Sequence, residues 1–175
     1  ICYYYLRQLD KAEQYYKLSV KAANSIYKPN SIANLAILYL EREKYKEAEQ
    51  TLSNVDYKSF NSTDSSAIFN VLGEIEKHKK NYKKAIDYKN IVIAIDSREN
   101  RYVDLANDFL SVGIMYNELS NYKLADEYFR KSYQLLTLYD DENAKLMLLE
   151  NYVELEFNKN KNKAGIEYFR EFLNL

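Results

Sequence analysis

The side chains that most often take part in catalysis and metal binding are scarce in this sequence. It holds one cysteine, Cys2, and one histidine, His78. A single cysteine cannot form an intramolecular disulfide, and a single histidine cannot pair with another to hold zinc or iron. A Cys2–His78 nucleophile pair would need residues from distant segments, and His78 lies in the solvated stretch KHKKNYKK. We therefore predict no metal site and no catalytic histidine.

Motifs that bind nucleotides or activate a serine are also missing from the sequence. It has no Walker phosphate loop, no G-x-G-x-x-G and no G-x-S-x-G. Carboxylates are frequent, but most stand beside lysine as in the run 41–47, which is typical of a solvated helix face. We predict a protein without a cofactor that is not an enzyme. An enzyme with an unrecognised site remains the least favoured alternative.

The composition favours a helical protein. The chain has 175 residues, a net charge of -1, 47% apolar and 29% charged residues, but only 3 glycines and 1 proline. A chain rich in β-turns would need more glycine and proline. No apolar run reaches the roughly 18 residues of a membrane-spanning helix. Because the sequence begins ICYYYL and ends FLNL inside an apolar pattern, we interpret it as a piece of a longer protein. The compartment stays open between cytoplasm and, if a missing N-terminus carries a signal, periplasm.

The stretch 105–139 has the clearest helical pattern. Apolar and small residues recur at steps of three and four, then a short polar turn follows, and the same steps resume. This pattern predicts two antiparallel helices with a small residue at their closest contact. The residues are Phe109, Val112, Gly113 and Tyr116 in the first helix and Tyr122, Ala125 and Phe129 in the second.

Alanines corresponding to Ala125 recur along the whole chain. Ala12, Ala48, Ala85, Ala125 and Ala164 each follow a polar turn, at intervals of 36, 37, 40 and 39 residues. Twelve residues before the middle three stand Ala36, Gly73 and Gly113. We predict that Ala48, Ala85 and Ala125 are buried where paired helices meet.

This recurring pattern resembles the tetratricopeptide repeat (TPR), which combines an aromatic or large residue, L-G, a tyrosine, alanine and phenylalanine. The resemblance implies an all-α fold of stacked antiparallel helical hairpins that form a right-handed superhelix, an α-solenoid. Residues 1–175 would form a single array of about five hairpins, the first truncated. Two departures are periods above the usual 34 residues and Lys89, where a large apolar residue is usual.

The repeat alignment predicts the helices. The run Ile91–Ile95 looks β-like by composition, but we predict it as helical from its place in the repeat. Asp64 or Thr63 is predicted to cap the helix that starts near residue 65, and Asp140 and Asp141 the one near 142. The predicted helices after the truncated first unit are 31–42, 45–54, 65–78, 82–95, 98–119, 122–138, 142–157 and 162–174.

Similarity to tetratricopeptide proteins also implies that the first helix of each hairpin lines a groove that binds an extended peptide or a partner helix. Asparagine side chains both donate and accept hydrogen bonds, which suits recognition of a peptide backbone. Equally, these positions are consistent with an ordinary polar surface. The predicted groove residues are Asn30, Asn34, Ile37, Glu41, Asn70, Glu74, Lys77, Asn107, Leu110, Ile114 and Asn117.

Charge is distributed unevenly between the two kinds of turn. The stretches 77–84 and 158–163, inside hairpins, have net charges of +5 and +3, while 140–145, between hairpins, has -2. In a solenoid, turns of one kind follow one edge. The sequence therefore predicts a basic edge, which serves solubility or, alternatively, docks an acidic partner; a nucleic acid is the less favoured partner. The predicted edge comprises Lys79, Lys80, Lys83, Lys84, Lys159, Lys161 and Lys163.

The leading functional hypothesis is a non-enzymatic protein- or peptide-binding scaffold. Long-period repeats rich in tyrosine, asparagine and lysine resemble the sensor portions of bacterial regulators, which is an argument by analogy. Two alternatives stay open, a receptor for a short signalling peptide and a free-standing adaptor in complex assembly.

Overall fold

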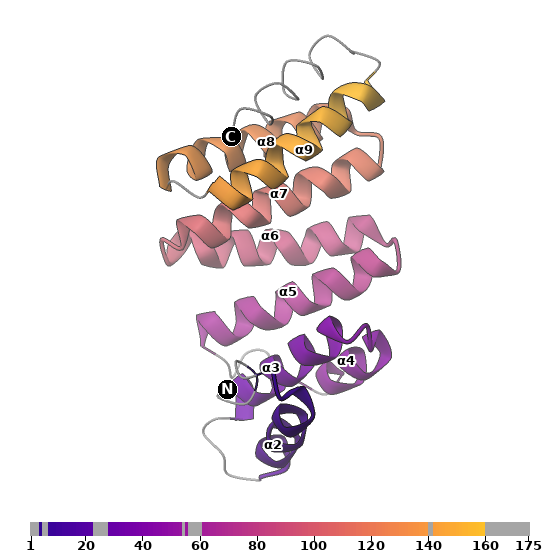
Figure 1. The fold of residues 1–175 in the computed structure, drawn as a ribbon, viewed down its shortest axis with the longest axis vertical. Helices are drawn as coiled ribbons and strands as arrows, with labels where there is room; N and C mark the ends of the chain where they lie inside the picture. The colour runs from indigo at the N-terminus through magenta and orange to yellow at the C-terminus, as the bar shows by residue number, and fades with distance from the viewer. Residues whose placement is uncertain are drawn as a thin grey trace. The chain divides into compact units, whose positions relative to one another are not determined.

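The computed structural model describes residues 4, 7–22, 28–53, 55, 61–139 and 142–159. Within these ranges it contains eight helices and no strand, so the all-α prediction is confirmed. Figure 1 colours the described helices in chain order from indigo to yellow. They are α2 (Leu9–Lys21), α3 (Lys28–Glu41), α4 (Tyr45–Leu52), α5 (Ser62–His78), α6 (Tyr82–Arg98), α7 (Tyr102–Glu118), α8 (Tyr122–Tyr139) and α9 (Glu142–Asn158).

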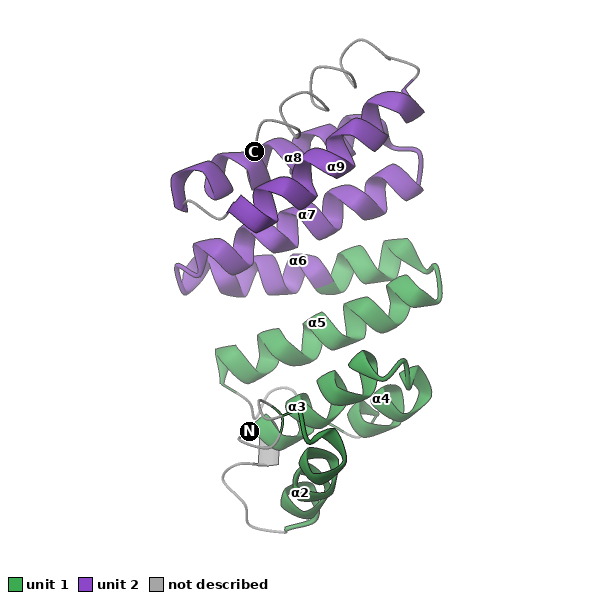
Figure 2. Cartoon of the chain, viewed as in Figure 1, with its two compact units in different colours: residues 1–88 green, residues 89–175 purple. Residues whose placement is uncertain are grey.

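The chain divides into two compact units, residues 1–88 and 89–175, with the boundary inside α6 (Figure 2). In unit 1, α3 packs against α2, α4 and α5. In unit 2, α7 and α8 form the tightest helix pair, and α9 packs against both.

The turns between helices are closed by residues in the left-handed region, and none of these residues is glycine. Such a conformation costs an L-residue free energy because Cβ approaches the carbonyl oxygen, and glycine usually fills this place. The residues are Arg7, Glu43, Lys80, Asn100 and Ser120, with φ between 56° and 60°.

Hydrogen bonds of the Schellman type hold these turns in place. At the end of α7, the Ser120 amide donates to the Asn117 carbonyl at 2.8 Å, and the Asn121 amide donates to the Tyr116 carbonyl at 2.9 Å. The turns at residues 43, 80 and 100 repeat this pair of bonds. A repeat alanine follows five residues after the left-handed residues 7, 43, 80 and 120, so the turn fixes which face of the next helix points inward.

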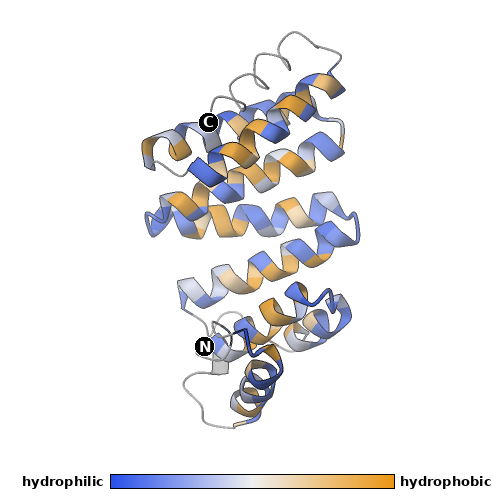
Figure 3. Cartoon of the chain, in the orientation of Figure 1, coloured by the Kyte–Doolittle hydropathy of each residue, from blue (hydrophilic) through white to orange (hydrophobic). Residues whose placement is uncertain are grey.

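The predicted burial of the repeat alanines is confirmed. Ala48, Ala85 and Ala125 are fully buried, and Ala12 is nearly so. Apolar and polar segments alternate along the helices (Figure 3), and the apolar sides form one core in unit 1 and one in unit 2. In unit 2, Gly113 leaves room for the Phe129 ring, because a Cβ on this glycine would lie 2.3 Å from the ring carbons Cδ1 and Cε1.

The sequence predicted three helix starts incorrectly: the helices expected to begin at residues 31, 65 and 98 begin at Lys28, Ser62 and Tyr102. Asn61 caps α5, and its side chain accepts a hydrogen bond from the Asp64 amide at 2.8 Å, so neither Thr63 nor Asp64 is the cap. An asparagine with extended backbone is a good N-cap, and it adds three residues to the predicted helix. Residues 91–95 lie inside α6, as predicted. The predicted caps at 140–141, Ala164 and the helix at 162–174 lie outside the described residues.

Candidate functional site

The predicted groove residues of α3 lie on one side of that helix. Asn30 and Glu41 are exposed, and Asn34 and Ile37 are partly exposed. The Asn34 side-chain amide donates to the Asn30 side-chain oxygen at 2.5 Å. The two asparagines therefore orient each other, and both keep accessible surface.

The predicted residues of α5 are partly exposed, and their charges are balanced. The Lys77 ammonium lies 2.8 Å from a carboxylate oxygen of Glu74, and Asn70 stands one turn before Glu74. The first-helix face of unit 1 thus presents amides and a neutral ion pair, together with Glu41 from α3.

Tyr4 belongs to the same face and was missed by the sequence prediction. Its hydroxyl donates a hydrogen bond to Glu41, and this bond, with burial, raises the pKa of Tyr4 to about 12. The repeat register could have found it: Tyr4 stands eight residues before Ala12, as Lys77 stands eight before Ala85.

Unit 2 corrects two of the predicted groove residues. Leu110 is only 4% exposed and packs in the core with Ala125 and Phe129. Asn117 is also buried, and its side-chain oxygen accepts a hydrogen bond from Asn158 of α9 at 3.2 Å. The physical reason is that α9 packs over this side of α7.

The other two predicted residues of α7 remain accessible. Asn107 is exposed and Ile114 is partly exposed. Ile114 packs against the core of unit 2 but keeps part of its side chain accessible.

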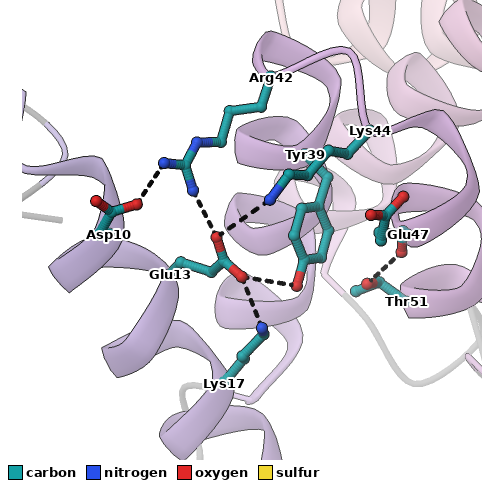
Figure 4. Close-up of polar contacts among 8 residues, drawn as sticks. All are labelled: Asp10, Glu13, Lys17, Tyr39, Arg42, Lys44, Glu47 and Thr51. Carbon is teal, nitrogen blue, oxygen red and sulfur yellow. Dashed lines mark hydrogen bonds and ion pairs between the residues drawn. The ribbon is translucent and has the colours of Figure 1, made fainter.

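The densest polar network in unit 1 surrounds Glu13 of α2 (Figure 4). Its carboxylate accepts hydrogen bonds from Lys17 at 2.6 Å, Arg42 at 2.6 Å and the Tyr39 hydroxyl at 3.3 Å. Lys44 lies 4.0 Å away. The hydrogen bond from Lys17 and the nearby cations lower the pKa of Glu13, so it stays ionised and ties α2 to the turn between α3 and α4.

A second carboxylate, Asp10, extends this network. It accepts a hydrogen bond from Arg42, whose guanidinium thereby bridges Asp10 and Glu13 (Figure 4). An open pocket of about 320 Å³ lies beside the network, lined by Asp10, Glu13, Gln14 and Lys17. Its cation, Lys17, is paired with Glu13, and Asp10 is bound by Arg42, so the charges beside the pocket are already compensated.

The contact between Arg42 and Glu13 has counterparts further along the chain. Lys79 pairs with Glu49 at 2.8 Å, and Lys159 approaches Asp126 at 3.8 Å. In each case the acid directly follows a repeat alanine, at 12, 48 or 125, and the cation is the first residue after the first helix of the next hairpin. We call these three contacts the repeat clasps. Between the third and fourth repeats this contact has no counterpart. Ile86 stands where the acid would be and Leu119 stands where the cation would be.

The repeat clasps change the interpretation of the predicted basic edge. Lys79 and Lys84 also approach Glu76, at 3.8 and 2.9 Å, and Lys159 binds Glu156 at 2.7 Å. Burial would raise the pKa of Glu76, but hydrogen bonds from Asn81 and Lys84 lower it below its ordinary value. Three of the predicted lysines are therefore compensated within the fold.

The structure describes two of the other four lysines of the predicted edge. Lys80 and Lys83 have no ion-pair partner among the described residues. Lys161 and Lys163 lie outside them. An acidic partner at this edge stays a prediction, now with fewer uncompensated charges to support it.

Lys89, the departure from the repeat pattern, forms a buried ion pair in unit 2. Its ammonium lies 2.9 Å from Oδ1 of Asp108, and the two residues are 7% and 4% exposed. The other oxygen, Oδ2, has no hydrogen-bond partner among the described groups. Burial raises the pKa of Asp108 to about 6, although Lys89 opposes this rise.

The structure describes one of the two residues that the sequence offered for catalysis, His78. His78 is exposed, as predicted, and stacks on Tyr45 with ring centroids 3.5 Å apart. Cys2 lies outside the described residues. In the described ranges, no group of three His, Cys, Asp or Glu side chains could hold a metal ion. None of the described helices has the length and apolarity of a membrane-spanning segment.

Solved structures with the same arrangement of helices are TPR proteins. A Desulfovibrio magneticus MamA structure shares 18% identity, and the match covers 97% of this chain and 88% of that chain with a TM-score of 0.75. A Podospora anserina protein, named for kinesin light chain and for nearly identical TPR-like repeats, shares 14% identity, with coverage of 98% and 88% and a TM-score of 0.78. The chain has a tetratricopeptide-repeat fold.

Another TPR structure belongs to a much larger protein. It is a Pyrococcus horikoshii signal transduction ATPase with numerous domains and a tetratricopeptide repeat sensor. The match has 17% identity and a TM-score of 0.84, and it covers 95% of this chain but 26% of that protein. No family model and no curated protein matches the sequence.

Proposed function

We propose that this TPR chain is a non-enzymatic protein-interaction scaffold that acts as the sensing part of a bacterial regulatory protein. The carrying observation is that both units keep amide and apolar side chains accessible on their first helices. Asn34 and Ile37 do so on α3, and Asn107 and Ile114 on α7. Amides match the donors and acceptors of a peptide backbone, and the isoleucines offer apolar contact.

The TPR fold supports a binding role but does not identify the partner. TPR arrays stack helical hairpins whose successive first helices present extended surfaces. The sensor role draws support from the signal transduction ATPase, whose TPR portion is described as a sensor. The proposed partner is a protein or peptide segment held against the first helices.

Site-specific photo-crosslinking tests this proposal. A photoreactive residue replaces Asn34 or Asn107 in the full chain, and Gln50 of α4 or Gln134 of α8, which are exposed on second helices, serve as controls. We expect one and the same partner to be crosslinked from the first-helix positions and not from the controls. Equal crosslinking from both sets, or none from the first helices, would reject the proposal.

A further inference from the structure

Helix α9 has apolar residues on two opposite sides. Leu148, Leu155 and Tyr152 are buried in unit 2, whereas Met147 and Phe157 are 56% and 51% exposed. An amphipathic surface helix normally keeps its apolar residues on the side facing the core, and a helix that is apolar on several sides is normally covered on several.

Two glutamates lie on the exposed side of α9, between its apolar residues. Met147, Glu150, Glu154 and Phe157 follow one another at steps of three, four and three, which places them in one stripe along the helix. We call this set the α9 stripe. Both glutamates are exposed, and neither has an ion-pair partner in the part of the chain that the structure describes.

The two described lysines at the ends of α9, Lys145 and Lys159, contact other residues. Lys145 lies over the ring of Tyr133 in α8, 5.9 Å from its centroid. Lys159 is bound to Glu156 and approaches Asp126. The α9 stripe is therefore acidic and apolar, without a basic side chain of its own.

Helix α8 shows what an ordinary solvated face looks like in the same unit. Its acids and bases alternate and pair one turn apart, Arg130 with Asp126 at 2.9 Å and Lys131 with Glu127 at 2.8 Å. Such pairs compensate each other on the helix surface. Helix α8 also carries large exposed apolar side chains, Leu138 and Tyr139. The α9 stripe differs from it in charge, because its two exposed carboxylates have a single sign and no ion-pair partner among the described residues.

The accessible side of α7 continues this surface. Asn158 of α9 donates to Asn117 of α7, which joins the two helices at one end. Beside this contact α7 presents Ile114, and further along it Asn107, but no lysine or arginine lies within the helix. A ligand on the α9 stripe would thus meet further apolar and amide groups on α7.

We propose that the α9 stripe, with the adjoining side of α7, binds a basic amphipathic segment of a partner protein. Lysine or arginine side chains of this segment face Glu150 and Glu154, and its apolar side chains cover Met147 and Phe157. Charge complementarity selects such a segment and repels an acidic one, while the flexible methionine adapts to the apolar side chains. This inference rests on the proposed scaffold function and names the chemistry of the partner.

Fluorescence anisotropy with the full chain tests it. The probe is a fluorescein-labelled amphipathic peptide of lysine and leucine, compared with the same peptide carrying glutamate in place of lysine. We expect binding of the basic peptide only. The double variant Glu150→Gln/Glu154→Gln should bind it about three- to tenfold more weakly, as expected for two exposed ion pairs.

Two further variants separate a docking surface from general charge attraction. Met147→Ser/Phe157→Ser should weaken binding even at high salt, where exposed charges are screened. Glu127→Gln on α8 changes the charge in the same direction at a residue paired with Lys131, and should leave the affinity unchanged. Circular dichroism checks that each variant is folded.

Several results would overturn the inference. They are equal binding of the acidic peptide, equal weakening by Glu127→Gln, and self-association that Phe157→Ser abolishes in sedimentation, which would mean that a second copy covers the stripe. If crosslinking from Asn34 and Asn107 still captures one partner, only this inference fails. If crosslinking fails as well, the scaffold function fails with it.

Discussion

At the scale of single residues, the Lys89–Asp108 pair is the clearest local exception in the TPR pattern. Lys89 stands four residues after a repeat alanine, where the neighbouring repeats have Leu52 and Phe129. Asp108 stands five residues before Gly113, as Ile68 stands before Gly73. A buried ion pair therefore occupies positions that are apolar in other repeats.

We expect the protein with apolar side chains at positions 89 and 108 to be at least as stable as the protein with the ion pair. Lys89→Leu alone leaves a buried carboxylate without its counter-ion and should cost about 3–5 kcal/mol of unfolding free energy. The double variant Lys89→Leu/Asp108→Ile should restore stability or exceed the original by about 1–4 kcal/mol. Urea denaturation of the single and double variants measures this. A double variant as unstable as Lys89→Leu would show that the pair is required for packing.

The same carboxylate gives a pH prediction. The pKa of Asp108 rises from 3.8 to about 6 on folding, so between these pH values the folded state binds a proton that the unfolded state lacks. The contribution of Asp108 to the free energy of unfolding therefore increases as the pH falls from 7 towards 4, by up to ~3 kcal/mol.

Comparison with Asp108→Asn isolates this contribution. The variant cannot titrate at this position, so its stability relative to the original chain should fall as the pH is lowered. Glu13 and Glu76, whose pKa values are lowered, have the opposite slope in both proteins and cancel in the difference. A stability difference that stays constant from pH 7 to 4 would contradict the prediction.

At the scale of helices, the contact between α7 and α8 depends on a glycine. Gly113→Ala improves helix propensity by about 1 kcal/mol, but the new methyl group would overlap the Phe129 ring. We expect a net loss of about 1–3 kcal/mol. Thermal unfolding would measure it.

A second substitution should rescue this loss. In the second repeat, Ala36 and Leu52 occupy the positions of Gly113 and Phe129. Phe129→Leu should therefore recover part of the stability in the Gly113→Ala background, although it lowers stability alone. Absence of any rescue would mean that the clash is relieved elsewhere.

The turns between helices offer a gain in stability. Ser120 has a φ of 56°, so Ser120→Gly should remove backbone strain and stabilise the fold by about 0.5–1 kcal/mol. The control, Gln134→Gly at an exposed position inside α8, should destabilise it by about 1 kcal/mol. A lower melting temperature for Ser120→Gly would show that the serine side chain contributes to the turn.

At the scale of the whole molecule, the sequence predicted the fold better than the site. Alanines at regular intervals and helical periodicity located the hairpins, because the repeat requires small residues where helices meet. These patterns could not predict that Leu110 and Asn117 are buried, because their burial depends on packing against α9, which is distant in sequence; Asn158 of α9 bonds Asn117 across 41 residues. The charge of the turns could not show which lysines are compensated, because Lys79 pairs with Glu49 from the preceding hairpin.

The last prediction concerns the end of a peptide that the first helices would bind. A terminal carboxylate is held by charge-assisted hydrogen bonds from cations. Of the predicted groove residues, only Lys77 is basic, and it is paired with Glu74. We therefore expect the lysine–leucine peptide to bind equally well with a free and an amidated C-terminus, as measured by calorimetry.

A designed cation gives the matched positive control for this expectation. Asn107→Lys places an ammonium on the exposed side of α7, a helix that contains no lysine or arginine. This variant should acquire a several-fold preference for the free carboxylate, because exposed ion pairs contribute up to about 1 kcal/mol. If the original chain already prefers the free carboxylate strongly, a cation outside the predicted face must hold it, and the binding surface lies elsewhere on the TPR array.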